Sequence, residues 1–270
     1  MEIVGKCWSV FKLAWSERMA YRVNFFLEIL SGILGSLIVV FLWIAIYRGG
    51  GRETMGGYSI REMVTYLFGA GLINSFILTT AENPDTSQSI QEGSLSSLLI
   101  QPFSPYLVWF ARDLGSKCFL FFIGLAGYFG VFAFMIDYLV SPASGGYLRL
   151  FLVAIIMASL LQFFLFEALS LLSFWIENTY GIRFTVRVIM EVASGAIIPL
   201  SLFPDAFQKI LLVLPFPFLI YFPMRIYLGK ISVHYAVPGL LAQTGWIVGL
   251  ALANAAIWKK GLRRYVSMGD

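Results

Sequence analysis

Six long apolar segments constrain this chain more than any other feature of its sequence. They lie at about residues 24–47, 62–81, 115–136, 148–173, 185–202 and 237–258. Each is near the roughly 20 residues that a helix needs to cross the hydrocarbon core of a bilayer. Charged residues make up 13% of the chain, about half the ~25% typical of a soluble domain. We therefore predict an all-α polytopic membrane protein, a single transmembrane domain over residues 1–270 with about six transmembrane helices.

Residues 1–22 predict a helix that lies in the headgroup layer. Val4, Trp8, Phe11 and Trp15 recur at helical spacing, and polar or charged residues occupy the other faces. Such a stripe is typical of an interfacial helix with its aromatic side facing the lipid. An extension of the first span is the alternative, because helix boundaries are hard to place.

The distribution of Lys and Arg predicts the orientation of the spans. With both termini inside, twelve of the 19 Lys and Arg residues fall on the cytoplasmic side and seven on the other. Cytoplasmic loops carry the excess of these residues in membrane proteins, so we expect both termini in the cytoplasm. The basic residues are scattered, apart from a cluster at 259–264, so we expect no nucleic-acid partner.

Two connections are more than simple loops. The first, residues 82–114, lies on the cytoplasmic side, and its apolar positions Ile90, Leu95, Leu98 and Leu99 predict a short amphipathic helix. Pro102 and Pro105 are expected to end it, because proline disfavours helical continuation.

The second connection, residues 203–236, lies on the extracytoplasmic side. Pro204, Pro215, Pro217 and Pro223 break an otherwise apolar run. The run is too interrupted to span, so we expect re-entrant or interfacial helices packed against the bundle.

Small residues predict close helix contacts. They are Ser31, Gly32, Gly35 and Ser36 in the first span and Gly245 and Gly249 in the last. Spacings of four let helix backbones approach closely. Both contacts within the chain and contacts between subunits remain open.

Three polar residues fall within the expected spans: Asn74, Glu167 and Glu191. An ionisable group at membrane depth is a functional-site hypothesis, and a structural hydrogen bond to a neighbouring helix is the alternative. Arg187 lies four residues before Glu191, a spacing that allows an ion pair on one helix and favours a structural role.

The sequence predicts no catalytic chemistry within the chain. It lacks a Gly-x-x-x-x-Gly-Lys-Ser/Thr loop that would cradle ATP phosphates. The one histidine, His234, cannot form a histidine metal cluster, and Cys7 and Cys118 form no Cys-x-x-Cys motif. We therefore expect no catalytic residue, no metal site and no cofactor in this chain.

Three features together resemble the permease subunits of ATP-binding-cassette (ABC) transporters of the type-2 exporter class. The first is the order of an interfacial helix, six spans and a basic tail. The second is residues 90–102, which read IQEGSLSSLLIQP: an acidic residue, a glycine, a leucine-rich turn and a proline. The third is residues 195–204, which read GAIIPLSLFP, followed by Leu214-Pro215-Phe216 and by residues 223–229.

The resemblance implies a division of labour. ATP and Mg²⁺ would bind to a separate cytoplasmic ABC ATPase, and a second permease subunit, the same chain or a different one, would complete an export path in the plasma (inner) membrane. The coupling helix that docks on the ATPase would lie near residues 89–101. Its docking residues would be Glu92, Gly93, Ser94, Leu95, Leu98, Leu99 and Pro102. The path would run between spans near Asn74, Glu167 and Glu191.

Alternatives remain open. The stretch near residues 89–101 is also compatible with an ordinary interfacial helix. A secondary transporter or channel would use Glu167 or Glu191 as an ion site. Such folds usually have internal repeats, and segments 82–114 and 203–236 do not match each other. A lipid-modifying enzyme is disfavoured by the single histidine. A structural scaffold would leave the proline-broken segment without a role.

Overall fold

The computed structural model describes residues 2–20, 22–51, 53–82, 85–102 and 104–267. Seven longer helices are α1 (Glu2–Ala20), α2 (Arg22–Gly50), α3 (Ile60–Ile77), α6 (Pro105–Phe132), α7 (Gly145–Ser170), α8 (Tyr180–Ala193) and α11 (Val233–Ser267). Four shorter helices are α4 (Asp85–Gln91), α5 (Leu95–Leu99), α9 (Asp205–Val213) and α10 (Tyr221–Tyr227). The 3-10 helices are η1 (Thr79–Glu82), η2 (Ala133–Tyr138), η3 (Leu171–Phe174), η4 (Leu200–Leu202) and η5 (Phe216–Phe218). Strands β1 (Thr54–Met55) and β2 (Tyr58–Ser59) form an antiparallel hairpin.

The all-α polytopic prediction is confirmed, but six spans are not. Among the described residues, four helical segments are long and apolar enough to cross a membrane: Leu30–Gly50, Pro105–Val131, Gly145–Phe174 and Val233–Tyr265. The other two expected spans correspond to α3 and α8, which have 18 and 14 residues.

The helix α3 is less apolar because it lies in the centre of the bundle. It packs against α2, α6, α7 and α10, and most of its side chains are buried. A helix surrounded by protein does not need a lipid-compatible surface on every side, so polar residues such as Thr65 and Asn74 are tolerated in it. A capping box, in which the Ser59 and Glu62 side chains each bond the other's backbone N–H, fixes its start.

The helix α8 is shorter than the predicted span 185–202 because Gly195 ends it. Gly195 has φ +79°, a conformation that glycine adopts without a steric penalty. The N–H of Ala196 then donates to the Glu191 carbonyl oxygen at 3.2 Å, the bond of a helix C-terminal motif. The chain turns there and continues as η4.

The helix α6 starts ten residues before the predicted span 115–136. Pro105 lies in its first turn, where the missing N–H of proline has no partner to lose. The short helix before the two prolines ends at Leu99, as predicted, but Pro105 also begins α6. The connection predicted over 82–114 therefore ends at residue 104. This places Arg112, which was predicted to lie in the connection, on a helix.

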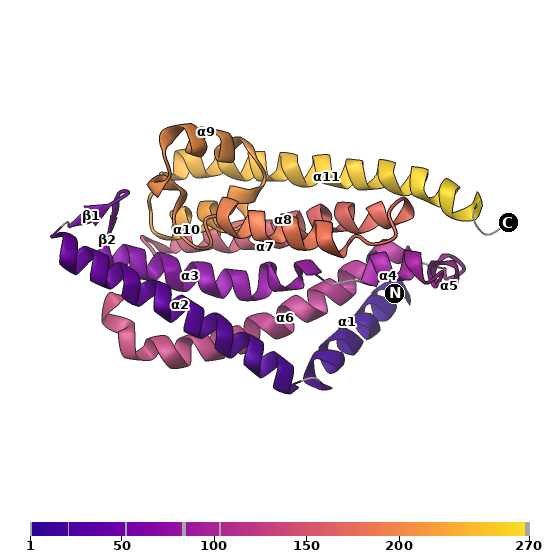
Figure 1. Cartoon of the computed structure of the whole chain (residues 1–270), viewed down its shortest axis with the longest axis horizontal. Helices are drawn as coiled ribbons and strands as arrows, with labels where there is room; N and C mark the ends of the chain where they lie inside the picture. Colours follow the sequence, from indigo (N-terminus) through magenta and orange to yellow (C-terminus); the bar gives the residue numbers. More distant parts are fainter. Residues whose placement is uncertain (1, 21, 52, 83–84, 103, 268–270) are drawn as a thin grey trace.

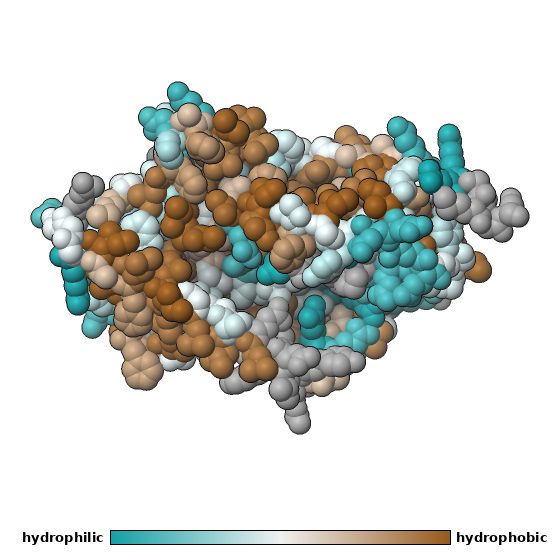
Figure 2. Space-filling model, in the orientation of Figure 1, coloured by the Kyte–Doolittle hydropathy of each residue, from teal (hydrophilic) through white to brown (hydrophobic). Residues whose placement is uncertain are grey.

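The two ends of the bundle are formed by different elements (Figure 1). The β-hairpin, α9 and α10 lie at one end, and α4, α5, the start of α1 and the end of α11 lie at the other. Figure 2 shows hydrophobic residues across the middle of one face and hydrophilic residues gathered at the α4–α5 end. The broken segment and the α4–α5 segment therefore lie at opposite ends of a mainly apolar bundle.

The helix α1 lies along α6. The Trp15 ring meets the Phe119 ring edge-on, with centroids 5.2 Å apart, and a Cβ at Gly115 would clash with the Phe11 backbone. Part of the aromatic stripe thus faces α6. Of the small residues predicted at helix contacts, Ser36 has its hydroxyl 2.9 Å from the Tyr128 hydroxyl of α6, whereas a Cβ added at Gly32, Gly35, Gly245 or Gly249 would meet no atom within 4 Å. These glycines are not packing sites within the chain.

Candidate functional site

The segment between α3 and α6 is built around a turn at Gly93. It consists of two short helices, α4 and α5, in place of the single helix predicted from the sequence. Gly93 joins them with φ +77°, a left-handed conformation that costs a residue with a Cβ about 1–2 kcal/mol. The turn predicted at Gly93 is therefore present, and the exposed residues Glu92 and Ser94 flank it.

The apolar side of this segment packs against the bundle, so one residue of the predicted docking set, Leu95, is not on the surface. Leu95 is 0% exposed and lies in a cluster with Ile90, Trp109, Phe163 and Phe174. Leu98 packs on the same cluster and is partly buried. Leu95 therefore fixes the segment to α6, α7 and η3, and it is not accessible to a partner.

The outward side of α5 carries the accessible apolar residues. Leu99 is 41% exposed and Ile100 is 86% exposed, and Pro102 is exposed beside them. Ile100 was not among the predicted docking residues, although the run Leu98-Leu99-Ile100 in the sequence could have suggested it. Of the predicted docking residues, Glu92, Gly93, Ser94, Leu99 and Pro102 are thus exposed, and Ile100 is exposed beside them.

Polar contacts attach the segment to the long helices. Arg112 of α6 contacts Glu17 of α1 at 2.7 Å and Asp85 of α4 at 3.3 Å. The Thr86 hydroxyl donates to Glu167 Oε2 of α7 at 2.9 Å. A displacement of α4 would therefore be transmitted to α1, α6 and α7 through these contacts.

The last helix is attached to the same turn. The Tyr265 hydroxyl of α11 donates to the Gly93 carbonyl oxygen at 2.9 Å and lies 3.0 Å from Ser96 Oγ. Its ring also packs at the edge of the cluster around Leu95. No local pattern in the sequence predicts this contact, because the residues are more than 160 positions apart.

A polar cleft of about 300 Å³ lies between α2, α3, α6 and α8. Its polar lining comes from Ser31, Ser36, Asn74, Ser75, Thr79, Tyr128 and Arg187. The Ser36 and Tyr128 hydroxyls lie 2.9 Å apart across it, and the exposed residues Gly32, Gly35 and Ile197 leave it open on one side. So many hydrogen-bonding groups in a membrane-embedded bundle are suited to a hydrated or substrate-filled space.

The three polar residues predicted within spans are not brought together. Asn74 and Arg187 line the cleft. Glu191 forms the expected ion pair with Arg187, with the guanidinium 3.5 Å from the carboxylate oxygen. Glu167 lies elsewhere, buried behind α4 beside a cavity of about 30 Å³ with Asp113 and Gln162. Its bond to Thr86 favours a structural role.

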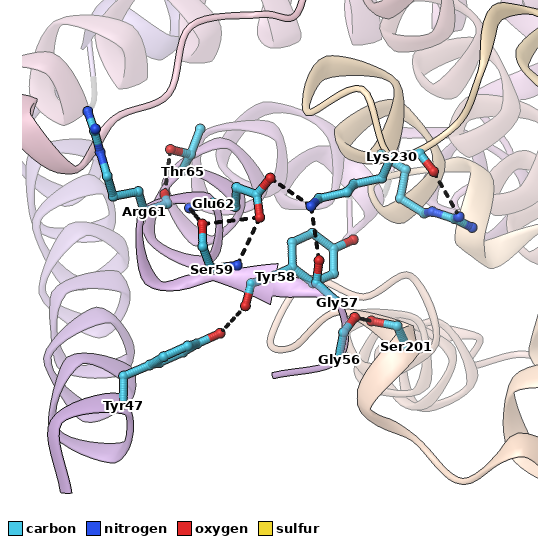
Figure 3. Close-up of polar contacts among 11 residues, drawn as sticks. Tyr47, Gly56, Gly57, Tyr58, Ser59, Arg61, Glu62, Thr65, Ser201 and Lys230 are labelled. Carbon is cyan, nitrogen blue, oxygen red and sulfur yellow. Dashed lines mark hydrogen bonds and ion pairs between the residues drawn. The ribbon is translucent and has the colours of Figure 1, made fainter. Parts of the chain in front are cut away.

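A second polar cluster joins the β-hairpin to the turn between α10 and α11 (Figure 3). Lys230 Nζ lies 2.6 Å from Glu62 Oε1 and donates to the Gly57 carbonyl oxygen at 2.9 Å. Glu62 Oε2 accepts from the Ser59 N–H at 2.8 Å. One ammonium group thus connects the start of α3, the hairpin and the approach to α11.

Neighbouring contacts strengthen this cluster. Lys230 lies over the Tyr58 ring, 5.4 Å from its centroid, and burial raises the pKa of the Tyr58 phenol, so the ring stays neutral. The Tyr47 hydroxyl donates to the Tyr58 carbonyl oxygen at 2.7 Å, and Ser201 Oγ donates to the Gly56 carbonyl oxygen at 2.9 Å (Figure 3). The hairpin is therefore attached to α2, η4 and the α10–α11 turn.

Comparison with known proteins identifies the family. A family model described as "ABC-2 family transporter protein" matches residues 23–269, almost the whole chain. The search of curated proteins gave no match. The match agrees with the apolar bundle. The chain belongs to the ABC-2 transporter family and is a multi-pass membrane permease subunit of an ABC transporter.

Proposed function

We propose that this chain is the permease subunit of an ATP-driven exporter, with ATP and Mg²⁺ bound by separate ATPase subunits. The observation that carries the proposal is the α4–α5 segment, which exposes Leu99 and Ile100 at one end of the bundle. Exposed apolar side chains on a hydrophilic end favour a protein partner. The family and the resemblance to type-2 exporters support an ABC ATPase in that place.

The attachments of this segment support a mechanical role. ATP binding would draw two ATPase subunits together and displace α4 and α5. Arg112, Thr86 and Tyr265 would pass this displacement to α6, α7 and α11, since each makes or receives a direct bond from the segment. Rigid-body tilting of helices is a common response to such a displacement.

The cleft supports a path shared between two permease subunits. It is open along the exposed residues Gly32, Gly35 and Ile197, so one chain alone does not enclose it. A second permease, the same chain or a different one, would cover that side. Cargo would then pass between the subunits along Asn74 and Arg187. The proposed location is the plasma (inner) membrane, with both termini and α4–α5 in the cytoplasm.

Co-purification tests the proposal. The tagged chain is isolated from its native membrane in mild detergent, and accompanying proteins are identified by mass spectrometry. We expect a subunit with a phosphate-binding loop to co-purify, and the double variant Leu99→Asp and Ile100→Asp to lose it. A matched control makes the same change at Phe207 and Ile210, which are exposed on α9 at the other end. If cross-linked membranes yield no ATP-binding subunit, the proposal is contradicted.

A further inference from the structure

A groove of about 690 Å³ lies beside the α4–α5 segment. Three parts of the chain form it: the turn at Gly93 and Ser96, the residues Phe174–Glu177 after α7, and the end of α11 at Arg264 and Tyr265. Two of these parts lie far from the α4–α5 segment in the sequence, which explains why the sequence did not predict the groove.

The groove lies outside the hydrocarbon core. The apolar stretch within α11 has 33 residues, which is ~50 Å at 1.5 Å per residue against a core of ~30 Å. Its end therefore projects beyond the lipid. Lys259, Lys260, Arg263 and Arg264 are all exposed on this end, as expected for a surface in water.

Apolar side chains are nevertheless exposed there. Trp175 and Ile176, on the wall of the groove, are each 40% exposed. On α5, Ser96 lines the groove and the exposed Leu99 and Ile100 follow it. Gly93, one of the predicted docking residues, also lines the groove, so the groove is continuous with the proposed docking surface. Lipid tails cannot cover side chains that lie in water, whereas a protein partner can.

We propose that this groove is a second docking site for the ATPase subunit, which inserts an apolar side chain from an acidic part of its surface. The inference rests on the proposed function and adds to it. An acidic surface fits because, among the described residues, the four basic residues exposed at the end of α11 outnumber Glu92, beside Gly93, and Glu177, on the groove wall. Opposite charges across an interface favour encounter and fix the register.

The shape of the groove supports a link between docking and movement. The Tyr265 hydroxyl holds α11 against the Gly93 turn, and a Cβ at Gly261 would clash with the Phe174 ring. An inserted side chain would therefore contact α4–α5, the α7–α8 connection and α11 together. The ATPase would move α7, α8 and α11 through this site and not only through α4.

Site-specific photo-cross-linking tests the inference. Benzoylphenylalanine replaces Trp175, Ile100 or Leu252 in separate variants, and native membranes are irradiated. Leu252 is the control, because it is 67% exposed within the α11 span. We expect the positions of Trp175 and Ile100 to capture the same phosphate-loop-containing subunit, and the position of Leu252 not to capture it.

A second measurement uses affinity. The variant Trp175→Ala with Ile176→Ala should weaken co-purification of the ATPase at least about tenfold, as truncation of an aromatic anchor at an interface does. Leu252→Ala should leave it unchanged. Capture at Ile100 but not at Trp175 overturns this inference and leaves the proposed function standing. Capture of lipid or of a second copy of this chain at Trp175 also overturns it. Failure at both positions overturns both proposals.

Discussion

The Tyr265 hydroxyl lies 2.9 Å from the Gly93 carbonyl oxygen, so the last helix is bonded to the turn that joins α4 to α5. Tyr265→Phe removes this bond and the contact with Ser96 while keeping the ring. One hydrogen bond contributes about 1 kcal/mol. We therefore expect about fivefold faster amide hydrogen exchange in residues 93–99, measured by mass spectrometry, with little change elsewhere. Tyr235→Phe, at the opposite end, is the control, and equal exchange in the two variants would contradict the expectation.

Gly93 offers a test of backbone conformation alone. A Cβ there would meet only the Tyr265 hydroxyl, at 3.9 Å, so steric clash is small. The positive φ of 77° should make Gly93→Ala cost about 1–2 kcal/mol, and Gly93→Asn less, because asparagine tolerates this conformation better. Thermal unfolding in detergent measures the order. Equal losses for both variants would mean that the turn does not keep this geometry.

Alanine substitutions of two leucines in α5 should affect different properties: Leu95→Ala should lower stability, and Leu99→Ala should lower ATPase binding. Leu95→Ala removes a side chain that is 0% exposed, and such a change costs about 2–5 kcal/mol. Leu99→Ala changes an exposed position and should alter stability by less than about 0.5 kcal/mol. Thermal unfolding separates the two, and ATPase co-purification should be lowered by Leu99→Ala at unchanged stability. A stable Leu95→Ala protein would contradict the burial of that side chain.

The cleft should be hydrated. In a chain whose Cys7 and Cys118 are replaced by alanine, Asn74→Cys should react with a charged thiol reagent at least about tenfold faster than Leu252→Cys, because a thiolate forms in water and not in hydrocarbon. Leu252 is a suitable control because it is more exposed but lies within the apolar span of α11. Mass spectrometry of timed samples gives the rates. Equally slow reaction at the two sites would mean that water does not enter the cleft.

The apolar length of the segments predicted α2, α3 and α7 to within a few residues, but not all of the helix boundaries. The predicted spans 24–47 and 148–173 correspond to Arg22–Gly50 and Gly145–Ser170. Hydropathy does not register backbone stops, so the fifth span was drawn through Gly195, which ends α8. The third was started too late because Pro105 was taken as a stop and not as a helix start.

The sequence indicated where the candidate docking segment lies, but not which of its side chains are buried and which are exposed. The stretch around Gly93 stood out by its leucines. The left-handed turn then separates α4 from α5, so Leu95 points into the aromatic cluster while Leu99 and Ile100 face outward. One continuous helix would have placed these leucines differently. Tyr265, Trp175 and Tyr128 come from distant segments, and no local pattern predicts such contacts.

The ion pair between Lys230 and Glu62 should behave as an anchor at the far end of α3. Glu62→Gln keeps an oxygen for the Ser59 N–H. Lys230→Met removes the bond to the Gly57 carbonyl oxygen and the ammonium over Tyr58 as well as the ion pair. A double-mutant cycle isolates the 2.6 Å ion pair, because those other losses are the same with or without the Glu62 carboxylate. The cycle should give a coupling energy of about 1 kcal/mol, the upper range for a partly exposed pair. Thermal unfolding measures the cycle, and Lys209→Met on α9 is the control for lost charge.

The coupling energy between Glu62 and Lys230 also tests how α3 moves when α4 is displaced. The start of α3 is held by Glu62 and Lys230, and its other end continues through η1 toward α4, where the ATPase is proposed to act. A displacement of α4 would therefore tilt α3 about a fixed far end. If the two substitutions are additive, the ion pair does not hold that end, and α3 would shift along its length instead. Amide exchange in residues 54–59 separates these outcomes, because only a lost anchor frees the hairpin in the double variant.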